Sequence, residues 1–171
     1  MPNSTRFLSF QREIRFYEEL TNASVAQVPR FIASKEIQNG NGKIMAMEDL
    51  DPLGFPARFK NRCNFSFEQV LPMVRWLAKF HASFWQNETA AEVMWPVATY
   101  WNIEKRKDEF QKCKDDSELV KKGEILDKMI HSAKYKTLIH GDGKVENFCF
   151  STDGKKVAGI DFQWSGQGMD S

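Results

Sequence analysis

The sequence feature that most constrains the fold lies near the end of the chain. The residues read H-G-D-G-K-V-E-N over 140–147 and D-F-Q over 161–163, and two short apolar runs separated by Ser-Thr-Asp-Gly lie between them. Ser, Asp and Gly at those offsets favour a tight turn, so the segment predicts a loop, a β-hairpin and then an acid. Because a hairpin brings its two ends together, we expect Asp142, Asn147 and Asp161 to converge on one small volume.

The chemistry of this residue set favours phosphoryl transfer. Two carboxylates and a carboxamide form an all-oxygen set, which suits Mg²⁺ better than a soft metal. In phosphoryl transfer an aspartate accepts the proton of the substrate hydroxyl, while an asparagine and a second aspartate hold the Mg²⁺ that bridges the nucleotide phosphates. A lysine two residues after the first aspartate, here Lys144, can reach the transferred phosphate as a point charge.

The motif is specific, although a plainer interpretation exists. From average residue usage, H-G-D-x-x-x-x-N should occur by chance in on the order of one chain per thousand of this length, and D-F-Q at hairpin distance makes it rarer. The alternative is an ordinary β-hairpin with polar ends.

The same motifs carry a family resemblance. The order H-x-D-x-K-x-x-N, hairpin, D-F-x is that of the catalytic loop and metal motif of protein kinases. H-G-D in place of H-R-D resembles the small-molecule kinases, namely aminoglycoside phosphotransferases, choline kinases and their relatives. D-F-Q looks most like the ecdysteroid-kinase-like group, also called CHK-kinase-like. The resemblance implies an α+β protein-kinase-like fold and ATP- and Mg²⁺-dependent transfer of the γ-phosphate to the hydroxyl of a small-molecule alcohol.

The resemblance also implies a role for each residue of the motif. Asp142 matches the catalytic base, and Asn147 and Asp161 match the metal ligands. We expect Lys144 to neutralise charge that develops on the transferred group. His140 is expected to brace the backbone next to the metal aspartate.

Two lobes are expected, with a partial small lobe over 1–50 and a mainly helical lobe over 51–171. D-P-L-G-F-P after residue 50 breaks regular structure twice through its prolines and marks the boundary. Within the first lobe, residues 7–20 predict a helix whose apolar face recurs at three- and four-residue steps; its members are Phe7, Phe10, Ile14 and Tyr17. By the resemblance, Glu13 on this helix matches the glutamate that pairs with a phosphate-gripping strand lysine. The alternative is a solvated acid paired with Arg12 or Arg15.

A predicted hairpin follows, with strands at 35–38 and 43–47 around two Asn-Gly pairs. The second strand runs into M-E-D-L, which consists of Met47, Glu48, Asp49 and Leu50. This segment looks like the hinge whose backbone holds adenine in the resembling family. A strand end with two exposed acids is an equal alternative.

The second lobe predicts mainly helices. Ser66-Phe67-Glu68-Gln69 has capping-box spacing and opens a helix to about Gln86. Its apolar stripe is expected at Val70, Val74, Leu77, His81 and Phe84. His81 on this stripe favours a hydrogen-bonded core histidine over a proton shuttle. Residues 103–134 predict one or two amphipathic helices broken near 115–117, and 136–139 predict a short strand.

Four aromatic residues are expected to crowd around Pro96, either lining a substrate pocket or packing in the core. They are Trp85, Trp95, Tyr100 and Trp101.

Composition excludes several classes of function. A net charge of +1 gives no electrostatic case for nucleic acid. No apolar run reaches the length of a membrane span, and the N-terminus lacks the apolar core of a signal peptide. The three cysteines, Cys63, Cys113 and Cys149, are odd in number and widely spaced, which favours free thiols in a reducing compartment. We therefore expect a cytoplasmic protein that acts on a small molecule, and the sequence leaves its oligomeric state open.

One departure from the resembling family keeps a second hypothesis open. Only Met1 to Arg6 precede the first helix, and that stretch contains neither a Gly-rich turn nor a lysine. We therefore expect either a fragment of a longer kinase or a degenerate relative. The corresponding alternative function is a non-catalytic, pseudokinase-like module that binds nucleotide or a partner.

Overall fold

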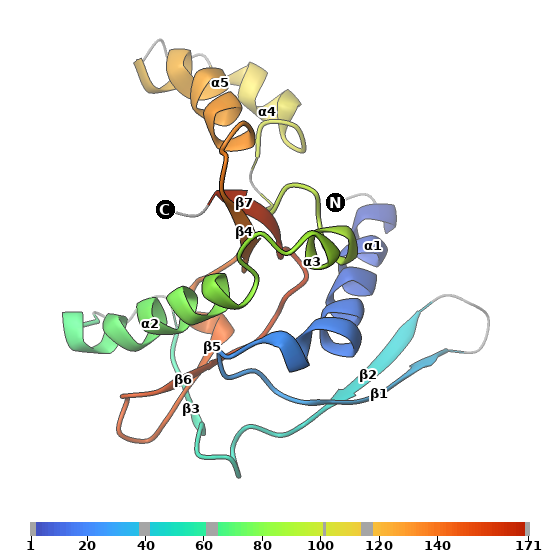
Figure 1. Ribbon diagram of the computed structural model, residues 1–171, viewed down its shortest axis with the longest axis vertical. Coiled ribbons are helices and arrows are strands. Elements are labelled where there is room, and N and C mark those ends of the chain that lie inside the picture. The colour runs from blue at the N-terminus through green and yellow to red at the C-terminus, as the bar shows by residue number, and fades with distance from the viewer. Residues whose placement is uncertain (1–2, 38–41, 61–64, 101, 114–117, 170–171) are drawn as a thin grey trace.

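The computed structural model describes residues 3–37, 42–60, 65–100, 102–113 and 118–169 (Figure 1). Strands and helices occur in separate runs along the chain, which confirms the predicted α+β class. The strands form three small sheets with the orders β1-β2, β3-β5-β6 and β4-β7. No helix among the described residues is long and apolar enough to cross a membrane.

The first helix, α1 (Asn3–Arg15), continues into a π-helical turn over Phe16–Leu20 and a 3₁₀ turn over Thr21–Ala23. The predicted helix is confirmed, but its first residues do not form the predicted buried face, because the Phe7 side chain is 38% exposed. Among the apolar residues of α1, Ile14 is the first that is buried. The π-helical turn lets both Phe16 and Tyr17 pack on Phe162, with ring centroids at 3.8 and 5.5 Å.

The hairpin that follows has β1 (Phe31–Glu36) and β2 (Lys43–Met47) in antiparallel register. Its first strand begins four residues earlier than the pattern predicted, since the run 31–36 is extended throughout. Most of the predicted Asn-Gly turn lies in 38–41, outside the described residues. Figure 1 shows this hairpin reaching away from the body of the molecule.

The long helix α2 (Phe67–Ser83) begins with the predicted capping box, in which the Ser66 N–H donates to Gln69 Oε1 at 2.9 Å. The predicted apolar stripe is right at Phe84, which is buried, and at Leu77, which packs against the core, but it is wrong at Val74. Val74 is 52% exposed, whereas Trp76 and Phe80 are buried. The buried face is set by Phe162 and the hairpin strand that α2 covers, which helical spacing alone does not reveal.

Three α-helices and five strands complete the described fold. Three further helices are α3 (Glu88–Val93), α4 (Lys107–Lys112) and α5 (Glu118–His131). The last two confirm two helices in 103–134, and the predicted break near 115–117 lies outside the described residues. The strands are β3 (Ala57–Arg58), β4 (Lys136–Ile139), β5 (Phe148–Phe150), β6 (Val157–Gly159) and β7 (Gly166–Met169).

These strands confirm the predicted strand at 136–139 and the predicted hairpin of β5 and β6. The antiparallel pairing of β4 with β7 was not predicted. It anchors the chain on both sides of the motif, because β4 leads into the H-G-D loop and β7 follows D-F-Q.

An aromatic core joins these elements. Phe162 lies at its centre, stacked on Phe16 and tilted against Phe80 at 5.6 Å. Trp76 stacks on Phe80 at 5.1 Å and donates its indole N–H to the Gln27 carbonyl. The middle residue of D-F-Q is therefore the residue around which α1, the π-helical turn and α2 pack.

The predicted aromatic crowd around Pro96 forms only in part. Trp95 stacks on Trp164 at 5.7 Å, and Tyr100 leans on the same ring at 4.9 Å. Trp85 lies apart, stacked on Tyr135 and 43% exposed. Trp101 lies outside the described residues. Trp95 is thus a core residue rather than the lining of a pocket with Trp85.

Candidate active site

The H-G-D loop is held by a buried histidine that follows β4. His140 Nε2 lies 2.9 Å from the Ile160 carbonyl oxygen, and Nδ1 lies 3.3 Å from the Asp142 backbone nitrogen. A carbonyl only accepts and a backbone N–H only donates, so Nε2 carries the proton and Nδ1 is the acceptor. Burial lowers the pKa of His140, which keeps the ring neutral. This geometry is what the expected bracing role requires, since one ring ties the loop to the residue before Asp161.

Gly141 cannot be replaced by a larger residue without moving the backbone. Its φ is +80°, and a Cβ there would lie 2.0 Å from the Trp164 carbonyl oxygen. That oxygen also accepts the Thr99 backbone N–H at 3.1 Å. The loop is therefore pressed against the segment after D-F-Q, which explains H-G-D in physical terms.

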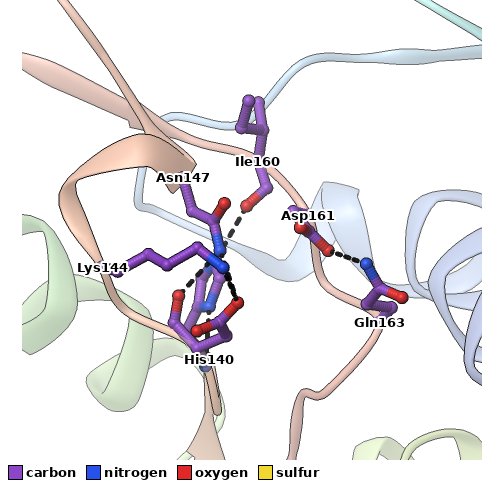
Figure 2. A network of polar contacts seen from close by, with 7 residues as sticks. His140, Lys144, Asn147, Ile160, Asp161 and Gln163 are labelled. Atoms are coloured by element: carbon purple, nitrogen blue, oxygen red, sulfur yellow. Dashed lines mark hydrogen bonds and ion pairs between the residues drawn. The ribbon is translucent and has the colours of Figure 1, made fainter. Parts of the chain in front are cut away.

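Asp142 and Asn147 are brought together as predicted, and Lys144 joins them. Lys144 Nζ lies 2.6 Å from Asp142 Oδ2, and Asn147 Nδ2 donates to the same oxygen at 3.1 Å (Figure 2). Asn147 Nδ2 also donates to the Asp142 backbone carbonyl at 2.8 Å. The hydrogen bond with Asp142 raises the pKa of Lys144. A buried asparagine and a half-exposed lysine thus hold one carboxylate oxygen of Asp142.

Asp161 stands at the other end of the hairpin, in the left-handed region with φ +65°. The Ile160 N–H donates to the Asn147 carbonyl at 3.0 Å, so the two hairpin ends meet as predicted. The carboxylate itself is turned toward Gln163, whose Nε2 donates to Asp161 Oδ1 at 2.7 Å. Figure 2 shows Asp161 and Gln163 facing each other, on the opposite side of Ile160 from Lys144.

The donor set fits magnesium. Because Asn147 uses its NH₂ group on Asp142, its carboxamide oxygen is left for a cation, and Asp161 keeps one carboxylate oxygen beyond the Gln163 contact. Within the described ranges, no group of three or more His, Cys, Asp or Glu residues could hold a metal by itself. Two oxygen ligands completed by phosphate oxygens and water are the usual arrangement for Mg²⁺ bound with a nucleotide.

Glu13 contacts the metal motif from α1. Its carboxylate lies by the Phe162 backbone N–H and near Asp161. Burial raises the pKa of Glu13 to about 7, the Asp161 charge adds to the rise, and the Phe162 N–H opposes it. The alternative of a solvated acid paired with Arg12 or Arg15 is wrong, because Arg12 donates to the Val93 carbonyl and Arg15 pairs with Glu19.

The predicted hinge begins at the end of β2, and its last residue packs on the β5–β6 hairpin. The Glu48 N–H donates to the Arg30 carbonyl at 2.9 Å, and the Asp49 carboxylate accepts the Asp51 N–H at 3.1 Å. Leu50 is buried against the β5–β6 hairpin through Cys149 and Ala158. Met47, the first hinge residue, ends β2. The adenine-binding role of these four residues stays a prediction.

Two residues at the site were not found from the sequence. Ser9 on α1 donates to Gln163, and in the sequence it was a small polar residue between Leu8 and Phe10 that gave no signal of this role. Lys105 packs its Nζ over Trp95 at 4.7 Å and donates to the Thr99 carbonyl at 2.8 Å. Burial lowers the pKa of Lys105 to about 8. In the sequence it was one member of a charge-rich run, so nothing separated it from its solvated neighbours.

The fold and site together define a kinase-like phosphotransferase, with a braced H-G-D loop, a hairpin and a D-F-Q segment in one core. A family model described as the phosphotransferase enzyme family, APH, matches residues 2–169. The chain therefore belongs to this family, whose members are phosphotransferases of small molecules. Membership confirms the resemblance to the aminoglycoside phosphotransferase and choline kinase superfamily, and the ecdysteroid-kinase-like group stays a prediction. No curated protein and no solved structure matches the chain at a significant level.

Proposed function

We propose that this protein transfers the γ-phosphate of ATP to the hydroxyl of a small-molecule alcohol and requires Mg²⁺. The observation that carries the proposal is the hydrogen-bonded cluster of Asp142, Lys144 and Asn147, joined by the hairpin to Asp161. Phosphoryl transfer depends on positioning and on charge stabilisation, and this cluster can supply both.

Asp142 is the proposed base. Its Oδ2 is held by Lys144 and Asn147, and neither contact uses Oδ1. We assign Oδ1 to the substrate hydroxyl, whose proton it accepts. Lys144 holds Oδ2 through its ion pair, and we assign its half-exposed ammonium a second contact with the transferred phosphate.

Asn147 and Asp161 are the residues that would hold Mg²⁺, and the Met47–Leu50 segment is the proposed adenine contact. When bound, Mg²⁺-ATP supplies the phosphoryl group and the cation that neutralises its charge. We place the lobe boundary after residue 50, because Leu50 passes from the β1–β2 hairpin into the core of the second lobe. The free thiols of Cys113 and Cys149 support a cytoplasmic location.

A non-catalytic nucleotide-binding module is the second candidate. The observation in its favour is Glu13, which lies near the carboxylate of Asp161, whereas the neighbouring Arg12 and Arg15 bond to other groups. In an active kinase of this type the corresponding glutamate holds a lysine on the α- and β-phosphates.

One experiment separates the two candidates. Calorimetric titration of ATP with and without Mg²⁺ should show metal-dependent binding to the wild type, and Asp161→Asn should remove that metal dependence. Asp142→Asn should retain ATP binding but lower turnover of an accepted alcohol by about 10²–10⁴-fold, the usual contribution of a general base. Binding without turnover of any alcohol supports the module, and metal-independent binding contradicts the assigned ligands.

A further inference from the structure

Gln163 is held by three hydrogen bonds that come from three separate parts of the chain. Its Nε2 donates to Asp161 Oδ1 at 2.7 Å, as Figure 2 shows. Its Oε1 accepts from Ser9 Oγ at 3.3 Å, and its backbone carbonyl accepts the Trp95 indole N–H at 2.7 Å. Because a carboxylate only accepts, the amide orientation is fixed, with nitrogen toward Asp161 and oxygen toward Ser9.

The groups that anchor Gln163 are themselves fixed. Ser9 is 1% exposed, and its hydroxyl shares its single proton between Gln163 and the Arg6 carbonyl at 3.0 Å. Trp95 is buried, stacks on Trp164 and carries the Lys105 ammonium over its ring. The indole contact is therefore the rigid one, and the serine contact is the weaker of the two.

This arrangement determines where the Asp161 carboxylate can point. Asp161 has a left-handed backbone, and its carboxylate could otherwise turn among several rotamers. The Gln163 amide holds Oδ1 at a fixed place, which leaves Oδ2 as the oxygen open to a cation. Hydrogen bonds of this kind orient carboxylates that bind metals and strengthen the metal site.

We propose that Gln163 is a positioning residue that holds the Asp161 carboxylate in the rotamer that binds Mg²⁺. The inference rests on the proposed function. It adds that Gln163, through Trp95 and Ser9, makes the metal ligand sensitive to the placement of α1 and of the residues that follow α3.

A purely structural role for Gln163 predicts something different. In that case the glutamine only joins α1 to the segment before β7, and its loss would lower the melting temperature without changing cation affinity. The test must therefore measure the two quantities separately.

The first experiment measures the apparent affinity for Mg²⁺ at saturating ATP by calorimetry. The melting temperature of each variant is measured in parallel. Gln163→Met keeps the length of the side chain and removes its donor, and we expect an apparent Mg²⁺ affinity about 10-fold weaker. Gln163→Glu keeps the shape of the side chain and the acceptor for Ser9 but sets a carboxylate against Asp161. This second variant keeps the test decisive if Gln163→Met does not fold. Gln111→Met, on the exposed side of α4, is the matched control and should match the wild type.

The second measurement needs no nucleotide. The side-chain NH₂ signals of Gln163 in an ¹⁵N NMR spectrum should exchange slowly with water and should shift in Asp161→Ala. A weaker Mg²⁺ affinity in the folded Gln163 variants together with a protected amide supports the proposal. Equal Mg²⁺ affinity in wild type and variants overturns it, as does an amide that exchanges freely. If the wild type itself does not bind Mg²⁺-ATP, the proposed function fails first and the positioning role fails with it.

Discussion

Replacing Glu13 by glutamine should make the protein less sensitive to pH. The Glu13 pKa is raised from 4.5 to about 7 in the folded state, chiefly by burial and then by the Asp161 charge. The folded protein therefore binds a proton that the unfolded chain has already released, so the free energy of unfolding falls as pH rises from about 4.5 to about 7. Above that window Glu13 is ionised in both states and adds no further change.

The magnitude follows from the same shift. A pKa raised this far corresponds to about 3 kcal/mol of unfolding free energy at full burial, and the partial exposure of Glu13 reduces the expectation to about 1–2 kcal/mol. Glutamine resembles the protonated acid and can still accept the Phe162 N–H. Glu13→Gln should therefore be about 1–2 kcal/mol more stable than the wild type at pH 8 and nearly equal to it at pH 5.

Urea denaturation followed by tryptophan fluorescence at pH 5, 6, 7 and 8 measures this difference, with EDTA present so that no cation compensates Asp161. Buried Trp76, Trp95 and Trp164 make the emission sensitive to unfolding. Glu124→Gln, on the exposed surface of α5, is the control and should follow the wild type. The reasoning is refuted if the free energy of unfolding changes with pH by the same amount in Glu13→Gln and in the wild type. Glu13 would then titrate as an exposed acid.

Two further predictions concern the packing around the motif. Gly141→Ala should cost about 2 kcal/mol or more of unfolding free energy in the same urea assay, because the new Cβ combines a left-handed backbone with a clash against the Trp164 carbonyl. Gly154→Ala is its control, with φ +68° and nothing within 4 Å of the added Cβ, and should cost only about 1 kcal/mol; equal losses at both positions would contradict the clash. Lys105 has a pKa lowered by burial to about 8, so the unfolded chain binds the extra proton and stability should rise with pH between about 8 and 10.5. Lys105→Met should remove that rise in thermal melts compared with the wild type, and an unchanged pH slope would show that Lys105 is solvated.

The local elements of this protein could be predicted from the sequence because their signals are local. The turn residues 151–154 specify the β5–β6 hairpin, and the capping box at Ser66 specifies where α2 begins. The residues of the H-G-D loop also converge for a local reason, since Asp142, Lys144 and Asn147 lie within six positions of one another.

Buried faces were less predictable, because burial depends on which distant element covers a helix. The stripe chosen for α2 included Val74, but the hairpin and Phe162 pack on Trp76 and Phe80 instead. The π-helical turn after α1 had no sequence signal either, since it reflects the packing of two consecutive aromatic residues on one ring.

The sequence by itself determined the kind of site, because residue types and short spacings fix the available donors: two carboxylates, a carboxamide and a lysine on a loop and hairpin. Only the tertiary structure decided how these side-chain groups are oriented. Ser9 and Gln163 are 154 positions apart and Trp95 and Gln163 are 68 apart, yet both Ser9 and Trp95 bond to Gln163, which in turn holds Asp161. Such contacts exist only after the aromatic core has closed around Phe162, because hydrogen bonds between remote segments are specified by packing and not by spacing along the chain.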